Sequence, residues 1–290
     1  MSSYIAKTTE AYLINPLTNL HVGSGDTTYG VVDKLVQRDL IEPFPTIHAS
    51  SLKGAFRQYF VQEIPAGEKL VSGIFGKGDA QNQDETIAGS HRFFAAEMLS
   101  FPVRSNRLPF FHATSIERIK SFLSFLTKLR YPHLEYWKEI VQQLSPFSPV
   151  KGKPHIFDRS LEGPVILEDF RYVASLPISL PENYLLPHAL RSLFGENLAL
   201  FHHEDLKQLC TNLPVLARNK LNNGQSVNVW YEEVVPRETR FLLLLTRPTT
   251  NRDFVDHLSA DSVVQIGGNA SVGCGYCLIN PISSFSDAHN

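Results

Sequence analysis

The run Phe241-Leu-Leu-Leu-Leu-Thr246 consists almost entirely of large apolar residues. It is much shorter than the roughly 20 apolar residues that a bilayer span requires, and no other apolar run of the sequence approaches that length. A short, continuous apolar run is typical of a strand that is buried on both faces. We therefore predict a buried central strand here, in a soluble chain that has no membrane partner.

Helical and extended patterns alternate along the rest of the 290 residues. Helices are predicted from residues 50–51, from 114, around 137–144, and over 182–194, 202–213 and 254–258. Extended segments are predicted at residues 10–17, 30–33, 91–104, 165–179, 230–235, 263–266 and 276–279. Because these segments do not follow a strict βαβα order, the pattern indicates an α+β fold. The length is sufficient for one large domain.

The helix that starts near Ser50 and Ser51 has the clearest pattern. Its apolar residues share one face at a spacing of 3.6 residues: Leu52, Ala55, Phe56, Tyr59 and Phe60. Both serines can cap the helix, and Lys53 and Arg57 share another face. Exposed amides, hydroxyl groups and Lys53 together form a candidate phosphate site. A capped amphipathic helix with two solvated cations explains the same residues.

Two glycine-rich loops are further candidates for phosphate binding. The first is Gly23-Ser-Gly25 with Asp26, and the second extends from Gly267 to Gly275. Glycine lets backbone amides approach a phosphate, and consecutive amides can form an anion-binding nest. The second loop has the glycine spacing of a Walker A motif, but Cys274 replaces the required lysine, which excludes an NTPase. Taken alone, each loop is better explained as an ordinary structural turn.

Two further segments carry local signals. Thr114 and Glu117 have the spacing of a capping box ahead of an amphipathic run. The stretch 67–89 is rich in Gly, Asp and Gln, which predicts a mobile surface loop.

Composition restricts the possible partners and compartment. The chain has 27 Lys and Arg against 29 Asp and Glu, a formal net charge of −2, so a polycationic nucleic-acid binder is excluded although a local basic groove is not. Three cysteines cannot form a disulfide framework, which indicates a reducing, cytoplasmic compartment. Cys274 and Cys277 lack a second pair for zinc. Asp33, in a mostly apolar segment, can bind a divalent ion or orient a nucleophile. A solvated surface aspartate with no such role explains the same position.

The motifs in their order resemble those of the RAMP superfamily of CRISPR proteins. They are His21-Val-Gly-Ser-Gly, Gly30-Val-Val-Asp-Lys-Leu-Val-Gln-Arg-Asp39, Ser50-Ser-Leu-Lys-Gly-Ala-Phe-Arg57, Phe93 to Ser105, Leu216-Ala-Arg-Asn-Lys-Leu-Asn-Asn-Gly, Trp230-Tyr-Glu-Glu-Val-Val-Pro236 and Gly267-Gly-Asn-Ala-Ser-Val-Gly-Cys-Gly-Tyr. Over nearly the whole chain they are similar to the repeated backbone subunit of type III-B (Cmr) CRISPR effector complexes.

The resemblance implies a single RAMP domain over residues 1–290. Its palm is expected to be ferredoxin-like and related to the RRM fold, with a mobile loop at about 65–90, a helical insertion at about 110–160 and a thumb hairpin at about 216–236. Copies of such a subunit stack along guide RNA together with other Cmr subunits. Each thumb displaces a base pair of the guide–target duplex, and the target RNA is cut beside it.

The resemblance also assigns roles to residues. Asp33 corresponds to the family's catalytic aspartate and is expected to hold a divalent metal ion, Mg or Mn, or to accept the 2′-hydroxyl proton. Guide-RNA contacts are expected from the following residues: His21, Ser24, Arg38, Ser50, Ser51, Lys53, Arg57, Arg218, Lys220, Gly267, Gly268, Asn269 and Gly273. Contacts to phosphate suffice, because base pairing supplies the specificity.

Some positions depart from the family pattern, and two alternatives stay open. Family members often carry Glu where this chain has Asp39, and Pro-Gly where it has His48-Ala49. The first alternative is a guide-RNA scaffold of the same fold without cleavage. The second is a metal-independent ribonuclease that processes CRISPR RNA, with His21 as acid–base catalyst.

Overall fold

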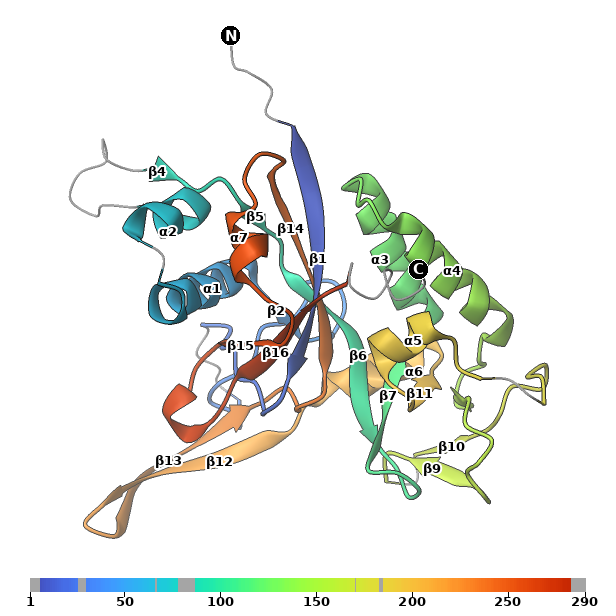
Figure 1. The fold of residues 1–290 in the computed structure, drawn as a ribbon. Coiled ribbons are helices and arrows are strands. Elements are labelled where there is room, and N and C mark those ends of the chain that lie inside the picture. The colour runs from blue at the N-terminus through green and yellow to red at the C-terminus, as the bar shows by residue number, and fades with distance from the viewer. Residues whose placement is uncertain are drawn as a thin grey trace.

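The computed structural model describes residues 6–25, 30–65, 67–77, 87–169, 171–182 and 185–282. One large sheet passes through the middle of these residues, helices lie on both of its faces, and a two-stranded hairpin projects from it (Figure 1). The predicted α+β class is confirmed. Within the described ranges, no helix has the length and apolar character needed to cross a membrane.

The helices are α1 (Ala49–Glu63), α2 (Glu68–Phe75), α3 (Ile116–Lys128), α4 (Leu134–Leu144), α5 (His188–Phe194), α6 (His203–Thr211) and α7 (Asp253–His257), with 3₁₀ turns η2 (Ser145–Phe147) and η3 (Ala270–Val272). The large sheet has the spatial order β15 (Ser262–Gln265), β16 (Tyr276–Pro281), β1 (Lys7–Pro16), β14 (Arg240–Pro248), β6 (Ala96–Arg104), β7 (Phe110–Thr114), β11 (Leu198–Leu200) and β8 (His155–Ile156). Two short strands pair at its sides, β2 (Thr46–Ile47) with β6 and β5 (Arg92–Phe93) with β14. Separate antiparallel pairs join β9 (Val165–Leu167) to β10 (Tyr172–Ala174), β12 (Val215–Asn222) to β13 (Gln225–Glu233), and β3 (Gly76–Lys77) to β4 (Ile87–Ala88).

Strand β14 lies in the interior of the sheet, between β1 and β6, and both of its faces are covered. Phe241, Leu243 and Leu245 belong to the apolar cluster that includes α1, α2 and α7. Leu242 and Leu244 belong to the cluster on the other face, with α3, α4 and α5. Side chains alternate along a strand, so a run of consecutive apolar residues fits a strand with a layer on each side. The predicted buried central strand is confirmed.

Helix α1 confirms the helix that was predicted from residues 50–51. Leu52, Phe56 and Phe60 are fully buried against the sheet and against Phe254 of α7, whose ring stacks on that of Phe60 at 5.4 Å. The serines, however, do not cap it. His48 is the N-cap residue and makes no side-chain cap bond, so both serines lie in the first turn.

The start of α3 corrects the predicted capping box by one residue. Ser115, not Thr114, is the N-cap, and its side chain accepts the Arg118 N–H. Thr114 is the last residue of β7, and its hydroxyl donates to the Leu99 carbonyl oxygen at 2.8 Å. The strand therefore uses the threonine, and the next residue begins the helix.

Several other predicted segments differ from the structure. The stretch 67–89 contains α2, because Val71, Ile74 and Phe75 have helical spacing and bury one face; residues 78–86 lie outside the described ranges. Residues 30–33 form no strand, and the residues that follow make isolated bridges at Lys34, Val36 and Arg38. The predicted strand 165–179 is the short pair β9–β10. The predicted helix 182–194 is α5 from His188, and residues 183–184 are not described.

The hairpin β12–β13 extends away from the sheet (Figure 1). At its tip, Asn223 and Gly224 both have positive φ angles, 48° and 78°. A two-residue turn with these angles matches the twist of a hairpin, and Asn-Gly is the preferred sequence for it. Most of the hairpin is exposed, and only its base, at Glu232 and Glu233, is buried. This buried base is where the candidate site lies.

Candidate nucleic-acid interface

The two glycine-rich loops, which are distant in sequence, meet beside the hairpin base. The Gly268 N–H donates to the His21 carbonyl oxygen at 2.9 Å. Gly267 has a φ angle of +84°, and a Cβ atom at this position would lie 2.4 Å from the same oxygen. Only glycine combines this backbone conformation with so close an approach. Gly267 and Gly268 therefore join the loops to each other.

The second loop uses several of its amides inside the protein. The Gly273 N–H donates to the Ala270 carbonyl oxygen, and the Cys274 N–H donates to that of Asn269. The amides of residues 269–271 make no hydrogen bond to another described residue. A phosphate contact of this loop is therefore expected at residues 269–271, and not at the amides of Gly268 or Gly273.

His21 lies under the first loop and not on its surface. The residue is 6% exposed, and Nδ1 is 2.7 Å from the Glu233 carbonyl oxygen. A carbonyl oxygen only accepts, so Nδ1 carries the proton and donates. The ring thereby fastens the loop to β13. Ser24, half-buried in the same loop, donates its N–H to the Leu35 carbonyl oxygen.

Gln37 was not singled out from the sequence, yet it connects the first loop to α1. Its Nε2 donates to the Gly23 carbonyl oxygen at 3.2 Å and to Ser51 Oγ at 3.1 Å. Its Oε1 accepts the His48 N–H at 2.7 Å. An amide head group both donates and accepts, which allows one buried side chain to hold three points. The buried position of Gln37 places the start of α1 beside the glycine loops.

The first turn of α1 presents unpaired donors to the surface. Because His48 supplies no side-chain cap, the first amides of the helix lack the partner that a cap would provide. Ser50 is exposed, and Lys53 makes no ion pair with another described residue. Amides and a cation in this arrangement attract an anion such as phosphate. Arg57 is directed elsewhere, because it donates to the Gly76 carbonyl oxygen at 2.6 Å.

Glu232 is the second residue that the sequence reasoning missed. Its side chain is 1% exposed and accepts four hydrogen bonds from four segments of the chain. The donors are Lys34 Nζ at 2.9 Å and Trp230 Nε1 at 2.7 Å on Oε1, and Arg218 Nε at 3.2 Å and Asn269 Nδ2 at 2.8 Å on Oε2. The only signal in the sequence was the Trp230-Tyr-Glu-Glu motif, to which no role was attached. Glu232 thus joins the segment that carries Asp33, the hairpin and the second glycine loop.

The charge of Glu232 is well stabilised. Burial by itself raises the pKa of this carboxyl group, but the hydrogen bonds from Lys34, Trp230 and Arg218 outweigh burial and lower the pKa to about 2. The carboxylate therefore stays ionised near neutral pH. It acts as a fixed anchor for its donors and has no proton to exchange there.

Asp33 lies at the surface, directly beside this anchor. Its Oδ2 accepts the Tyr231 N–H at 2.7 Å, and its own N–H donates to the Tyr231 carbonyl oxygen at 3.0 Å. The residue is exposed, and its Oδ1 makes no hydrogen bond with another described residue. These two hydrogen bonds hold Asp33 beside β13, so a carboxylate oxygen is presented at the root of the hairpin.

A divalent metal ion at Asp33 would receive few ligands from this chain. No group of three or more His, Cys, Asp or Glu side chains in the described ranges is arranged to hold a metal. Mg²⁺ is commonly bound through one or two carboxylates together with phosphate oxygens of the substrate. The free oxygen of Asp33 fits that mode if RNA completes the coordination, and it does not fit a site built from protein ligands alone.

The predicted cations of this region differ in how they are used. Arg38 is committed to the fold, since it donates to the carbonyl oxygens of Pro43 and Cys210 and pairs with Glu233 at 2.6 Å. Arg218 is partly used by Glu232 and by Cys274 Sγ at 3.4 Å. Lys220 is exposed on the hairpin and makes no ion pair with another described residue. Lys53 and Lys220 are therefore the two predicted cations best placed to meet phosphate.

Comparison with known proteins identifies what this arrangement is similar to. A sequence model of the RAMP superfamily matches residues 13–278. The CRISPR system Cmr endoribonuclease Cmr4 of Pyrococcus furiosus is 27% identical, over 92% of this chain and 94% of its own length. The CRISPR system CMR subunit Cmr4 of Saccharolobus solfataricus is 36% identical over 32% of this chain and 29% of its own length.

Solved structures share the fold. A chain of the type III-B Cmr-beta complex bound to cognate target RNA, determined by cryo-EM, superposes with a TM-score of 0.75 at 22% identity, covering 97% of this chain and 99% of that one. Oligomeric Cmr4 from Pyrococcus furiosus superposes with a TM-score of 0.64 at 20% identity, covering 94% and 97%. The mixed α+β architecture of this chain is therefore that of the Cmr4 structures.

Proposed function

Because the chain belongs to the RAMP superfamily, to which residues 13–278 match, we propose that it is the repeated backbone subunit of a type III-B CRISPR ribonucleoprotein. In this role it binds guide RNA as a filament of successive copies, associates with other Cmr subunits and cleaves complementary target RNA at regular intervals. The named relative that aligns over 92% of this chain is an endoribonuclease, which supports cleavage. The three cysteines of the present chain are free, which supports a reducing, cytoplasmic location.

The observation that carries the proposal is the single connected surface around the hairpin base. Gln37 joins the first glycine loop to α1, and Glu232 joins the second loop to the hairpin and to the Asp33 segment. The surface presents first-turn amides, Lys53 and loop amides together with the exposed carboxylate of Asp33. Such donors fit a phosphate backbone, whereas the carboxylate repels it and requires a different purpose.

The hairpin β12–β13 is proposed to be the thumb, and α3 and α4 the inserted helical region. The palm is proposed to be ferredoxin-like, with the order β1, α1, β6, β14, α7 and β16 along the chain. The spatial order β16-β1-β14-β6 and its antiparallel pairs support this assignment. So does the placement of α1 and α7 in the same apolar cluster. A split βαβ arrangement of this kind exposes loops at one end of the sheet, where the site lies.

Asp33 is proposed to be the catalytic residue. A nucleotide displaced from the duplex at the root of the hairpin can bring its 2′-hydroxyl in line with the adjacent phosphate. The free Asp33 oxygen would accept the hydroxyl proton or hold a divalent ion, and the products would be a cyclic phosphate and a 5′-hydroxyl. A divalent ion held there by Asp33 and by phosphate oxygens of the RNA would neutralise the negative charge that develops on the phosphate. The Tyr231 N–H orients the carboxylate in either role.

The test is Asp33→Asn in a complex reconstituted with guide RNA and labelled target RNA. The amide oxygen can still accept the Tyr231 N–H, so the segment keeps its position. We expect cleavage to fall at least about 100-fold, the low end of what one acid–base group supplies, with target affinity unchanged. Unchanged cleavage would overturn the assignment, and a wild-type complex that binds but never cleaves would indicate the scaffold alternative.

The processing ribonuclease based on His21 gains no support from the site. His21 is buried, and its Nδ1 proton is used by the Glu233 carbonyl oxygen. A chelator separates the two mechanisms, since it should stop a metal-dependent reaction and leave a histidine-based one intact.

A further inference from the structure

A cleft of about 590 Å³ lies between helix α1 and the edge of the large sheet. Strand β15 forms this edge, and α1 lies beside it (Figure 1). Val263 and Gln265 line the cleft, because they alternate along β15 with residues that are buried in the core. Tyr276 of β16, the cross-strand neighbour of Gln265, completes the sheet side. The described residues of the hairpin β12–β13 do not line the cleft, which is therefore distinct from the hairpin root that presents Asp33.

Three glutamines supply the polar groups of the cleft. Gln58 and Gln62 are exposed and one helical turn apart on α1, and their side chains make no hydrogen bond with another described residue. Gln265 Nε2 donates to the carbonyl oxygens of Gly267 at 3.0 Å and Cys274 at 3.3 Å, whereas its Oε1 accepts from none of the described residues. Because each carboxamide both donates and accepts, the cleft offers hydrogen bonds of both kinds to a ligand.

Two tyrosine rings supply flat surfaces in the same cleft. Tyr59 of α1 is half-buried, and its ring contacts that of Phe60 edge-on, with 6.0 Å between the centroids. Tyr276 is 40% exposed, which leaves part of its ring accessible. Aromatic rings bind unpaired nucleobases by stacking, largely without regard to sequence. The combination of rings and carboxamides therefore suits a planar ligand that carries both donors and acceptors.

The charge of the lining disfavours phosphate inside the cleft. Among the described residues that line it, Glu63 is the only charged one, and no Lys, Arg or His is present. A carboxylate repels a phosphate but not a neutral group. The volume lies within the roughly 300–1,000 Å³ of small-molecule sites, which is enough for a base with its ribose. The lining therefore suits the neutral part of a nucleotide.

The second glycine loop joins this cleft to the phosphate-binding surface. Ala270 lines the cleft, and it belongs to the residues 269–271 whose amides have no partner among the described residues. The two hydrogen bonds of Gln265 to Gly267 and Cys274 fix the loop to β15, so the loop and the cleft keep their relative position. A phosphate held by the loop amides would therefore place its own nucleoside at the mouth of the cleft.

We propose that the cleft binds an unpaired nucleobase of the RNA strand whose phosphates contact the second glycine loop, which in the proposed function is the guide strand. The inference rests on that function and adds a base subsite to it. Tyr59 and Tyr276 stack on the base, and the three glutamines meet its edge. A carboxamide can present either its oxygen or its NH₂ group, so all four bases are accommodated and base pairing remains the source of specificity.

The first test measures affinity for a labelled, unstructured single-stranded RNA by fluorescence anisotropy. Tyr276→Ala should weaken binding at least about fivefold, the low end of what one stacked base contributes. Tyr276→Phe keeps the ring and should bind as the wild type does. Loss of affinity in both variants, or in neither, would overturn the proposal.

The glutamines provide a second comparison in the same assay. Gln58→Ala/Gln62→Ala should weaken binding about fivefold or more, because two hydrogen bonds to the base are lost. Gln142→Ala/Gln208→Ala is the matched control, since these glutamines are exposed on α4 and α6 and lie outside the cleft. It should bind as the wild type does. Equal affinities of the two double variants would contradict a base held by Gln58 and Gln62.

The second test separates a base contact from a phosphate contact. On an RNA that keeps ribose and phosphate but lacks bases, Tyr276→Ala should bind as well as the wild type, because the contact that it removes is already absent. Lys53→Ala should still weaken binding to this RNA, and it should reduce the slope of log K against log salt by about 1. Tyr276→Ala should leave that slope unchanged. An equal loss for Tyr276→Ala on both RNAs would indicate a backbone contact or a folding defect and would overturn the proposal.

Failure of the base subsite is distinguishable from failure of the proposed function. If the wild type neither binds guide RNA nor cleaves target RNA, the proposed function fails. If the wild type does both and Tyr276→Ala binds RNA as tightly as the wild type, only the base subsite fails.

Discussion

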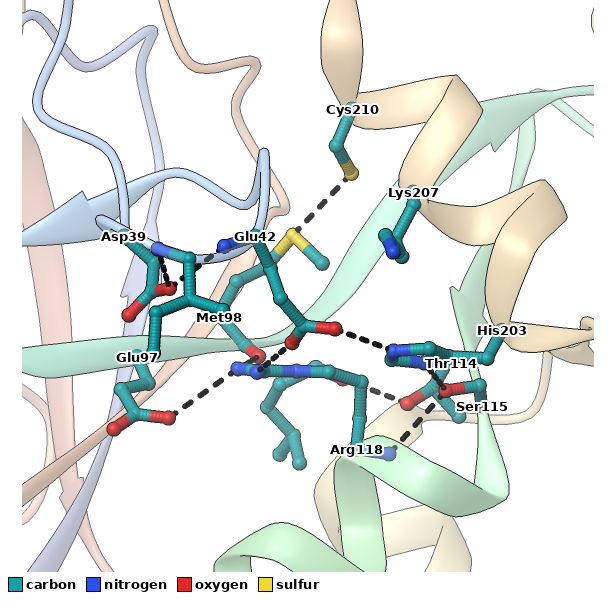
Figure 2. Close-up of polar contacts among 12 residues, drawn as sticks. Asp39, Glu42, Glu97, Met98, Thr114, Ser115, Arg118, His203, Lys207 and Cys210 are labelled. Atoms are coloured by element: carbon teal, nitrogen blue, oxygen red, sulfur yellow. Dashed lines mark hydrogen bonds and ion pairs between the residues drawn. The ribbon is translucent and has the colours of Figure 1, made fainter.

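Glu232 and Arg118 are both buried charged side chains, but they differ in how completely hydrogen bonds replace the water that each has lost. Glu232 receives four hydrogen bonds, two of them from cations that reach partly into solvent. Arg118 lies between two aromatic rings, and its Nε has no partner among the described residues. The first network joins segments that meet RNA in the proposed function, and the second holds the turn that carries Asp39 and Glu42 (Figure 2).

Their pKa shifts reflect this difference. Burial lowers the pKa of Arg118, and Glu97, Glu42 and Asp39 only partly oppose this. Burial likewise raises the pKa of Glu97 despite its pairing with Arg118. At Glu232 the hydrogen bonds outweigh burial. A buried charge is thus a strong anchor only where donors or acceptors fully replace water.

The largest effect on stability is expected from Glu232→Gln. The amide preserves volume but replaces an acceptor oxygen with an NH₂ group that faces donors such as Arg218 and Asn269. We expect the free energy of unfolding to fall by about 2–4 kcal/mol, as measured by urea denaturation near neutral pH. Glu139→Gln, on the exposed face of α4, is the control and should change it by less than about 0.5 kcal/mol. If both variants behaved alike, Glu232 would not be an anchor.

A smaller loss of stability is expected from Arg118→Met, about 1–2 kcal/mol, the order of the cost of leaving one buried acceptor without its donor. The side chains of Glu42 and Glu97 are 27% and 36% exposed, so water can replace the lost guanidinium. The methionine can fill the space between the two rings, and the Met98 carbonyl oxygen loses its donor. Arg252→Met, in an exposed pair with Asp256, provides the control. A loss as large as that of Glu232→Gln would contradict the contrast between the networks.

The smallest and most diagnostic effect is pH dependence. The folded pKa of Glu232 lies below its ordinary value of 4.5, so its contribution to stability is present above pH 4.5 and is lost as the pH falls from there through about 2. The folded pKa of Glu97 lies above 4.5, so ionising it costs stability as the pH rises from 4.5 through that value. Urea midpoints measured between about pH 3 and pH 6 should show the wild-type advantage over Glu232→Gln shrinking toward acid. The urea midpoint of the wild type should fall relative to that of Glu97→Gln as the pH rises toward neutral. Parallel slopes would contradict the assignment.

Local sequence patterns predicted much of the fold. The continuous apolar run predicted the central strand β14, and apolar residues at a spacing of 3.6 predicted helix α1. Helix α2 was not predicted, because the Gly- and Asp-rich stretch that follows it is typical of a loop. The cap of α3 was misplaced by one residue, since Thr114 and Ser115 are chemically equivalent as caps and only strand pairing distinguishes them.

The sequence predicted most residues of the candidate site but not the hydrogen bonds that connect them. Asp33, Lys53, Arg218 and the glycine loops were named, whereas Gln37 and Glu232, which join them, were not. Arg38 and Arg57 were expected to meet RNA, yet both donate to carbonyl oxygens of the protein. A charged residue gives the same sequence signal whether its partner is a phosphate or a backbone carbonyl.

The sequence by itself determined the α+β class, the central strand, the main amphipathic helix and membership of a family, because these depend on period and order along the chain. The tertiary structure alone decided which polar groups are free and which are used internally. Those pairings join residues far apart in sequence, and burial removes the water that would otherwise satisfy each group separately. A buried amide and a buried carboxylate therefore hold the proposed RNA-facing surface together, and a buried guanidinium holds the turn at Glu42.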